Sequence, residues 1–355
     1  MSPTTPVTTQ GRQGLLARLG DGPVLCAEGY VFELERRGYL QAGGFVPEVV
    51  VDHPEVLAQL HRDFLHAGSD VVEALTYYAH REKLRAIGRE HLLEPLNRQA
   101  LAIAGEVAAD SGALVAGNLS NTNVFEPDDP SSVHLVRQMF DEQLGWAVDA
   151  GVDYVIGETF SHAEEALVAL ELIKQTPLPA VITLAVHRAP ETREGWPVDQ
   201  ACRRLADAGA DVVGLNCSRG PRTMLPLLAP VTAAVDVPVA ALPVPYRTHD
   251  HQPSFQSLRD PDYDRLPGDR PFPTALDPFT CNRYELADFA HAARELGVAY
   301  LGLCCGAGPH HVRAMAEALG RTPPASRYSP DMSKHAFLGA DQWVRPDNRR
   351  FSRDY

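Results

Sequence analysis

The segment AGVDYVIGETF (150–160) contains the pattern on which the fold prediction rests. A helical pattern stops at Gly151, the residue type that most easily adopts the left-handed geometry of a helix end. A short apolar run follows at 154–157, and two polar residues, Glu158 and Thr159, stand where it ends. Related phrases precede three other apolar runs: AGSD (67–70), AGAD (208–211) and LGVA (296–299). This alternation is typical of parallel strands joined by crossover helices.

Eight such apolar runs occur along the chain. They are VLCAEG (24–29), VVEALTYY (71–78), ALVAGNLS (113–120), YVIGETF (154–160), AVITLAV (180–186), VVGLNCS (212–218), VPVAALPV (237–244) and AYLGLCC (299–305). Amphipathic stretches such as 53–68, 134–151, 162–175 and 284–297 separate them. Eight strand–helix units predict a closed (β/α)8 TIM barrel. A doubly wound open sheet is the alternative, weakened because no run is followed by a GxGxxG or Walker-type glycine loop.

Three segments lie outside this repeat. Residues 1–19 are expected to form a flexible N-terminus, 20–320 the barrel, and 321–355 a C-terminal extension that serves as a dimerisation arm or is partly disordered. The extension is polar with scattered aromatics, Trp343, Phe351 and Tyr355. The stretch 245–282, rich in Pro, Asp and Arg, is too long for a simple connection after the seventh strand and suggests a lid or an interface element.

Composition limits the function classes. Among 355 residues, 45% are hydrophobic and 22% charged, which fits a globular enzyme. The formal net charge of −14 disfavours nucleic acid as a partner. No apolar run approaches the roughly 18 residues that cross a bilayer, and the N-terminus lacks a secretory pattern, so we expect no membrane association and a cytoplasmic location.

Cysteines stand at the ends of two predicted strands. Cys217 ends the sixth run, and Cys304 and Cys305 end the eighth. Catalytic residues of such barrels come from the carboxyl ends of the strands, and the two strands are near neighbours. Three thiolates with one free position form a catalytic type of Zn²⁺ site.

Other interpretations of these residues remain open. Free cysteines are often simply buried, and a strained disulfide between Cys304 and Cys305 would leave Cys217 unexplained. The remaining cysteines, Cys26, Cys202 and Cys281, receive no ligand role. The histidines at 249, 251, 310 and 311 are interpreted as solvated or hydrogen-bonded rather than as ligands.

A zinc ion with thiolate ligands suits alkyl transfer to sulfur. A substrate thiol that takes the open position becomes a thiolate near neutral pH and keeps its nucleophilicity. Hydrolysis by zinc-bound water is less favoured, because three thiolates leave the metal poorly able to acidify water.

The motifs GLNCSRG (214–220) and LGLCCGAGPHHVRAMAE (301–317) resemble the two zinc-binding stretches of the homocysteine S-methyltransferase family. The segments ELERRGYLQAG (33–43) and FVPEVVVDHPEVLAQLHRDFLHAGSDVVEALTYYAHREKL (45–84) are similar to its betaine–homocysteine methyltransferase branch, as are HAEEA (162–166), PPAS and DMSKH in the tail. The resemblance covers roughly residues 20 to 345.

The resemblance implies roles for individual residues. Cys217, Cys304 and Cys305 would bind zinc, with homocysteine sulfur as the fourth ligand. Glu158 would hold the homocysteine ammonium, and the turn at Glu28 and Gly29 would present backbone N–H groups to its carboxylate. The remaining substrate-binding residues would be Phe45, Thr76, Tyr77 and Tyr78, with the tyrosine faces attracting the onium donor. Outside the resemblance, Glu158 could be a structural ion-pair member and the tyrosines ordinary core residues.

Three positions depart from the family pattern. The family's first strand ends in Asp-Gly-Gly, where this chain has Ala27, Glu28 and Gly29. A one-residue step reverses the direction of a strand side chain, so Glu28 is not established as the replacement for the aspartate. Phe45 stands where the branch has tryptophan, and Thr159 where it has tyrosine. All three changes bear on substrate recognition, the last two on the donor.

These observations predict methyl transfer from glycine betaine to zinc-activated homocysteine, giving methionine and dimethylglycine. A sulfonium donor, S-methylmethionine or dimethylsulfoniopropionate, is the first alternative. A noncatalytic zinc-binding barrel is the alternative of another class. The resemblance further implies a homodimer.

Overall fold

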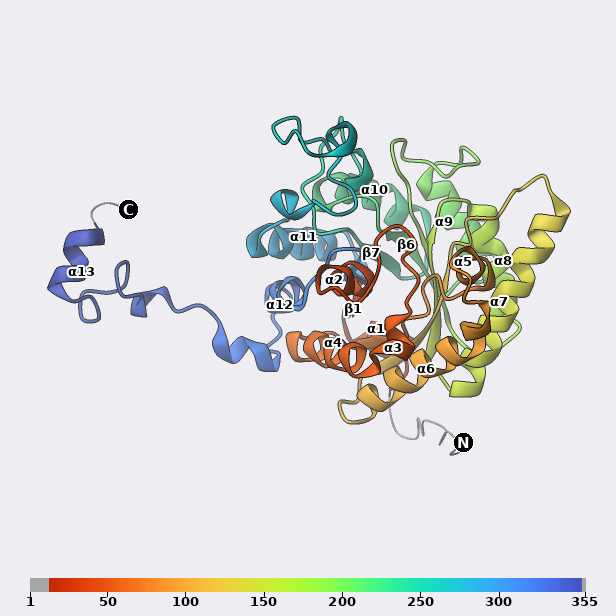
Figure 1. The fold of residues 1–355 in the computed structure, drawn as a ribbon, viewed down its shortest axis with the longest axis horizontal. Coiled ribbons are helices and arrows are strands. Elements are labelled where there is room, and N and C mark those ends of the chain that lie inside the picture. Colours follow the sequence, from red (N-terminus) through yellow and green to blue (C-terminus); the bar gives the residue numbers. More distant parts are fainter. Residues whose placement is uncertain (1–12, 353–355) are drawn as a thin grey trace.

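The computed structural model describes residues 13–352 as a (β/α)8 TIM barrel with an extended C-terminal arm (Figure 1), which confirms the predicted fold. The strands are β1 (Val24–Ala27), β2 (Val71–Glu73), β3 (Leu114–Ser120), β4 (Tyr154–Phe160), β5 (Ala180–Leu184), β6 (Val212–Asn216), β7 (Val239–Leu242) and β8 (Val298–Leu303). Seven lie within one of the eight apolar runs, and β8 begins one residue before its run; all hydrogen-bonded neighbours are parallel.

Helices lie around the sheet, except that α1 covers the amino end of the barrel and α13 lies on the C-terminal arm (Figure 1). They are α1 (Leu15–Asp21), α2 (Tyr30–Arg36), α3 (Val49–Asp52), α4 (Pro54–Ala67), α5 (Arg81–Ala86), α6 (Leu93–Ala109), α7 (Pro130–Ala150), α8 (Ala163–Ile173), α9 (Val198–Asp207), α10 (Pro221–Ala234), α11 (Arg283–Glu295), α12 (Pro309–Ala318) and α13 (Pro346–Phe351). Short 3-10 turns include η2 (Phe255–Ser257) and η5 (Pro324–Tyr328). No helix within residues 13–352 has the length and apolar character needed to span a membrane.

The aspartates of the AG-x-D phrases join neighbouring strands at their starts. The Asp70 carboxylate accepts a hydrogen bond from Leu25 N–H at 2.7 Å, and Asp70 N–H donates to the Leu25 carbonyl at 2.7 Å, which links β1 to β2. Asp153 accepts in the same way from Val115 N–H at 2.7 Å, and Asp211 from Ala180 N–H at 2.8 Å. The motif therefore ends a helix at its glycine and then fastens the next strand to the preceding one.

Side chains inside the barrel change from apolar to polar along the strands. The layer at the amino ends of the strands is apolar and includes Val24, Cys26, Val71, Leu114, Tyr154, Val181, Val212 and Tyr300. Leu15 of α1 belongs to this layer, so α1 covers the amino end of the barrel. The flexible segment expected over 1–19 is therefore wrong for Leu15 onward, where apolar contacts hold a helix; residues 1–12 lie outside the described residues. Above this layer the interior positions carry carboxylates and amides.

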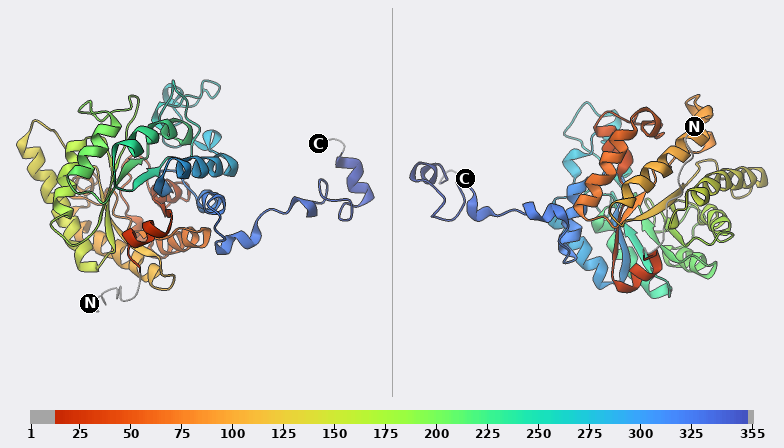
Figure 2. Two further views of the ribbon diagram at one scale, coloured as in Figure 1. Left: turned by 180° about the vertical axis from the view of Figure 1, so that it is seen from behind. Right: turned by 90° about the horizontal axis from the view of Figure 1, so that it is seen from below.

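The chain after η5 leaves the barrel as an arm (Figures 1 and 2). Large apolar side chains on it are exposed, with fractions of 55–61%: Met332, Leu338, Trp343 and Phe351; Tyr328, the last residue of η5, is also exposed. Tyr355, also expected to take part in this extension, lies outside the described residues. An arm with this many exposed apolar groups is of the kind that packs on another surface.

Candidate functional site

Three cysteine side chains converge at the carboxyl end of the barrel. Cys217 directly follows β6, and Cys304 and Cys305 directly follow β8. Their sulfur atoms all lie within 4.8 Å of one another, and Cys304 Sγ is 3.9 Å from Cys305 Sγ. All three are free thiols, so the vicinal disulfide considered from the sequence is not formed.

Strand β7 lies between the two cysteine-bearing strands and holds both. Cys217 N–H donates to the Leu242 carbonyl at 2.9 Å, and Cys304 N–H donates to the Pro243 carbonyl at 3.0 Å. Cys217 and Ser218 both have positive φ, 55° and 59°, which is strained for residues with side chains. Because this turn curls back at the strand end, Cys217 can face the pair from β8.

The thiols form a donor set that fits a soft metal cation. Cys217 and Cys304 are buried, and Cys305 is partly exposed. Hydrogen bonds from the Cys304 and Cys305 thiols hold the pKa of Cys217 well below its usual range, whereas burial raises the pKa of Cys304 well above it. Three neighbouring thiolates need a positive ion among them, and tetrahedral Zn²⁺ accepts three cysteines with one position left for substrate.

A layer of buried carboxylates lies beside the thiols. Glu28, Glu73 and Glu158 are 6%, 2% and 2% exposed. Asn118 Nδ2 bridges Glu73 and Glu158 at 2.5 and 2.6 Å. Asn216 Nδ2 bridges Glu158 and Glu28 at 2.7 and 3.3 Å. The two amides thus hold the three acids in one row across the barrel.

The three acids have few neighbouring groups that could balance their negative charge. Glu28 Oε1 and Glu73 Oε2 receive no hydrogen bond, and no basic side chain within residues 13–352 pairs with any of the three carboxylates. Burial raises the pKa of Glu158 to about 7 and those of Glu28 and Glu73 well above their ordinary range. A buried, unpaired acid cluster in an enzyme is a binding site for a positively charged group.

Glu28 points into this layer. It continues the inward alternation of Val24 and Cys26, and its carboxylate reaches both Asn216 and the neighbourhood of Cys304. Glu28 N–H donates to the Leu303 carbonyl at 3.0 Å, and its expected backbone contact with a substrate carboxylate stays a prediction. Gly29 packs tightly on the second cysteine turn: an added Cβ would lie 2.8 Å from Ala307 Cβ and 2.9 Å from the Cys304 carbonyl oxygen. Its expected contact with a substrate carboxylate stays a prediction.

The residues expected to bind the donor differ in their surroundings. Burial, Tyr78, and then Cys305 and Cys217 raise the pKa of Tyr77 well above its usual range. The Tyr78 ring lies against the Tyr77 ring, with ring centres 4.3 Å apart, and Lys83 Nζ lies 3.9 Å from the centre of the Tyr78 ring. Because a cation already occupies that face, a donor-binding role for the Tyr78 ring is not supported. Thr76 Oγ1 donates to the Asn118 carbonyl at 2.9 Å and is buried, so its hydroxyl is already used.

Two positions that differ from the family pattern have structural partners. Phe45 stacks on Phe32 with ring centres 5.3 Å apart, in an aromatic cluster with Phe255 and Phe272. Thr159 N–H donates to Asn216 Oδ1 at 3.0 Å, and Thr159 Oγ1 donates to Glu158 at 3.2 Å. Thr159 therefore orients Glu158 rather than reaching outward.

Sequence reasoning missed Glu73, Asn118 and the role of Asn216. Their signal is the alternation of strand side chains: Glu73 is two residues after the interior Val71, and Asn118 is two after the interior Ala116. Applied to each run, this alternation identifies the polar interior layer.

Known proteins are similar to this chain in sequence and in fold. The family model described as homocysteine S-methyltransferase matches residues 29–319. Betaine–homocysteine S-methyltransferase 1 of Xenopus tropicalis is 36% identical, covering 96% of this chain and 85% of the relative, and the Danio rerio protein of that name is 37% identical over 96% and 84%. S-methylmethionine–homocysteine S-methyltransferase BHMT2 of Mus musculus is 32% identical over 97% and 92%. The metallated form of homocysteine methyltransferase MmuM from Escherichia coli has a similar fold, with a TM-score of 0.66 at 19% identity over 85% of this chain and 99% of that one.

The buried carboxylates should destabilise the protein in the absence of substrate, and Glu73→Gln tests this. Because the folded-state pKa of Glu73 is raised, ionisation of Glu73 costs stability increasingly as pH rises above about 4.3, its value in the unfolded chain. We expect Glu73→Gln to raise the free energy of unfolding at pH 8 by about 1–3 kcal/mol, the usual cost of an unsatisfied buried group. The gain should shrink toward pH 5.

Denaturant unfolding at several pH values measures the effect. Glu106→Gln is the matched control, because Glu106 is exposed on α6. Equal effects of the two substitutions, or a gain independent of pH, would contradict the prediction.

Proposed function

The chain belongs to the homocysteine S-methyltransferase family, and from that premise we propose that it transfers a methyl group from glycine betaine to the sulfur of homocysteine. The products are methionine and dimethylglycine. The observation that carries the proposal is the set of three sulfur atoms, within 4.8 Å of one another, beside the buried Glu158. The family assignment makes this chain a methyltransferase enzyme and not a noncatalytic barrel.

Cys217, Cys304 and Cys305 would hold Zn²⁺ and leave one position for the acceptor sulfur. When bound, the ion supplies a Lewis acid that brings the pKa of the substrate thiol toward neutrality. The chain keeps the three sulfurs together through β7 and keeps water away through burial. Six free cysteines suit a reducing compartment such as the cytoplasm.

The acid layer would bind the amino group of homocysteine. Glu158 is held by Asn118, Asn216 and Thr159, so its position is fixed before substrate arrives. Glu28 and Glu73 each carry a buried oxygen without a donor, which an ammonium group can satisfy. One positive substrate group would therefore both place the acceptor and relieve the repulsion among the acids.

The donor would bind on the Tyr77 side of the thiols. An aromatic face attracts a quaternary ammonium group, and the thiols of Cys305 and Cys217 are among the groups that raise the pKa of Tyr77. The methyl group would pass directly between the two substrates, with the C–N bond breaking as the S–C bond forms. The leaving amine departs neutral, so no side chain has to donate a proton; the protein contributes alignment and a dry site.

A sulfonium donor is the second candidate. One relative at 32% identity is named for S-methylmethionine. The relatives named for betaine are 34–37% identical, which favours betaine.

We further propose that the arm after η5 packs on a second copy of the chain. The arm extends away from its own barrel (Figure 2), and its apolar residues such as Leu338 and Trp343 are exposed. A surface of this kind is stable in water when a partner covers it.

Replacement of one thiol tests the metal site. In Cys217→Ala we expect bound zinc to disappear and methionine formation to fall by about a thousandfold, because several kcal/mol of charge stabilisation are lost and each ~1.4 kcal/mol is tenfold in rate. Metal analysis and a methionine assay give the two readouts. Cys202→Ala, which removes a buried thiol in α9, should change neither. Activity retained in zinc-free Cys217→Ala would refute the role of the thiols.

A donor comparison tests the methyl source. Steady-state methionine formation from homocysteine is measured with glycine betaine, S-methylmethionine and dimethylsulfoniopropionate at matched concentrations. We expect the highest kcat/KM with betaine, because a quaternary ammonium matches the Tyr77 face. Turnover with a sulfonium donor and none with betaine would replace the first candidate by the second.

Sedimentation velocity at micromolar concentration tests the arm. We expect a dimer for the parent chain and a monomer for the double variant Leu338→Asp with Trp343→Asp, because each new carboxylate would have to be buried in the interface. Tyr263→Asp, an equally exposed site outside the arm at 49% exposure, should remain dimeric. A monomeric parent chain would show the proposal to be wrong.

A further inference from the structure

The connection between β7 and α11, residues 243–282, touches both cysteine-bearing turns. We define the first turn as residues 216–220, around Cys217, and the second as 303–308, around Cys304 and Cys305. The two ends of the connection are held together, since Arg247 N–H donates to the Phe279 carbonyl at 2.7 Å and Cys281 N–H donates to the Pro245 carbonyl at 2.8 Å. The two ends of the segment are therefore joined, and the segment forms a single structural unit.

The first turn is fastened to this segment through Ser218 and Gly220. Phe255 N–H donates to the Ser218 carbonyl at 2.8 Å, and Ser218 Oγ donates to Gln256 Oε1 at 3.1 Å. Gly220 N–H donates to Thr248 Oγ1 at 3.1 Å. On its other side Ser218 Oγ lies 2.8 Å from His187 Nδ1. These contacts hold a backbone that is strained at two successive residues.

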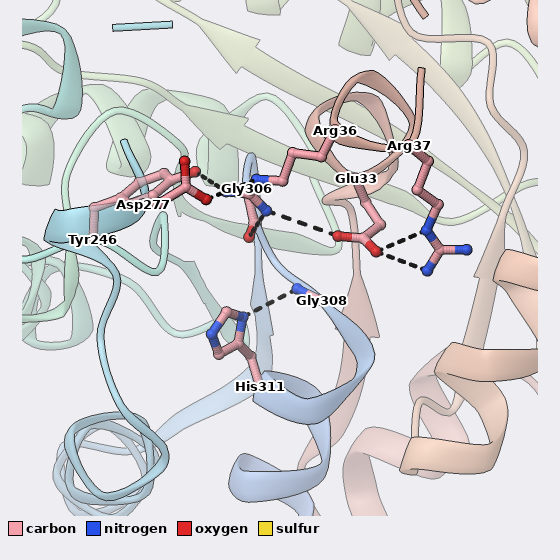
Figure 3. A network of polar contacts seen from close by, with 8 residues as sticks. All are labelled: Glu33, Arg36, Arg37, Tyr246, Asp277, Gly306, Gly308 and His311. Atoms are coloured by element: carbon pink, nitrogen blue, oxygen red, sulfur yellow. Dashed lines mark hydrogen bonds and ion pairs between the residues drawn. The ribbon is translucent and has the colours of Figure 1, made fainter. Parts of the chain in front are cut away.

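The second turn is fastened through Tyr246 and Arg36 (Figure 3). Arg36 of α2 donates to the Gly306 carbonyl at 3.1 Å and to Tyr246 Oη at 2.5 Å. It also forms an ion pair with Asp277 of the same segment at 3.8 Å. Gly306 has a φ of 93°, and an added Cβ there would collide with the Tyr246 hydroxyl. Tyr246 therefore defines where this turn can lie.

A ring pair within the connection links the contacts to the two turns. Tyr246, which contacts the second turn, and Phe255, which contacts the first, are stacked with ring centres 5.9 Å apart and planes 14° apart. Both are buried, at 0% and 2% exposure. Movement of one turn against the other would have to break this stack.

We propose that residues 243–282 are a positioning element for the thiols, in which Arg36, Tyr246 and Phe255 set the spacing of Cys217 from the Cys304–Cys305 pair. The inference rests on the proposed function, in which these thiols hold a metal. This role differs from that of a lid, because the segment contacts the backbone of the two cysteine-bearing turns. Arg36 is a positioning residue, since it reaches Gly306 and not the sulfur atoms.

Cobalt titration provides the test, because Co²⁺ with thiolate ligands absorbs in the near-ultraviolet and visible range. We expect Arg36→Met to lower Co²⁺ affinity by about 10- to 100-fold, the usual effect of removing an outer partner of a metal site, and to change the cobalt–thiolate bands. Tyr246→Phe keeps the stacked ring and removes the hydroxyl that Arg36 contacts. The loss of Co²⁺ affinity in the double variant should therefore be smaller than the two single losses combined. Arg36→Lys should recover part of the affinity.

Arg37→Met is the matched control, since Arg37 is the next residue of the chain and pairs with Glu33 instead of the turns. It should leave affinity and spectrum unchanged. Parent-like affinity and spectrum in both Arg36→Met and Tyr246→Phe would overturn the positioning role while leaving the metal site intact. If the parent chain gives no cobalt–thiolate band, the metal site fails, and this inference fails with it. Thermal unfolding of each metal-free variant separates a folding defect from lost positioning.

Discussion

Concentrated negative charge at the carboxyl end of the barrel is the constraint on which the site depends. Three cysteine sulfurs and three carboxylates lie in adjacent buried groups, with Cys304 common to both. In a low-dielectric interior such charges repel strongly unless cations or protons lie among them. The protein supplies amides, from Asn118 and Asn216, which orient the acids without neutralising them. Protons offset part of this charge, as the raised pKa values of the three carboxyl groups indicate, and bound positive groups can offset the rest.

The remainder of the barrel makes this arrangement possible. The interior layer at the amino ends of the strands is apolar and is covered by α1. Its burial stabilises the fold at a distance from the charged layer. The strand-joining aspartates work at the opposite end, where Asp70, Asp153 and Asp211 bind backbone N–H groups. Stability and charge are thus placed at opposite ends of the same strands, as is usual for this fold.

The sequence predicted the barrel and the three thiols because both follow from local pattern. A glycine, an apolar run and a cysteine at the run's end are each visible without knowledge of tertiary contacts. Glu73 and Asn118 were missed because their importance arises only when β2, β3 and β4 bring them together. The sequence also did not reveal that Lys83 contacts the Tyr78 ring or that Glu28 N–H donates to the Leu303 carbonyl, because both contacts depend on the folded structure. The sequence pattern identifies the side chains at strand ends, whereas their contacts with other residues in the folded structure determine what each of them can bind.

The fold constrains some residues near the thiols more firmly than others. The carboxylate layer is built from strand ends joined by short hydrogen bonds: Glu158 alone is held by Asn118, Asn216 and Thr159. Phe45 and Tyr78 lie on connections, where they adopt positive φ and contact Phe32 and Lys83. A substitution among interlocked strand ends disturbs several partners at once, whereas one on a connection disturbs few. Under the proposed function the carboxylate layer binds the amino group of homocysteine, so acceptor binding would depend on the most firmly constrained part of the site.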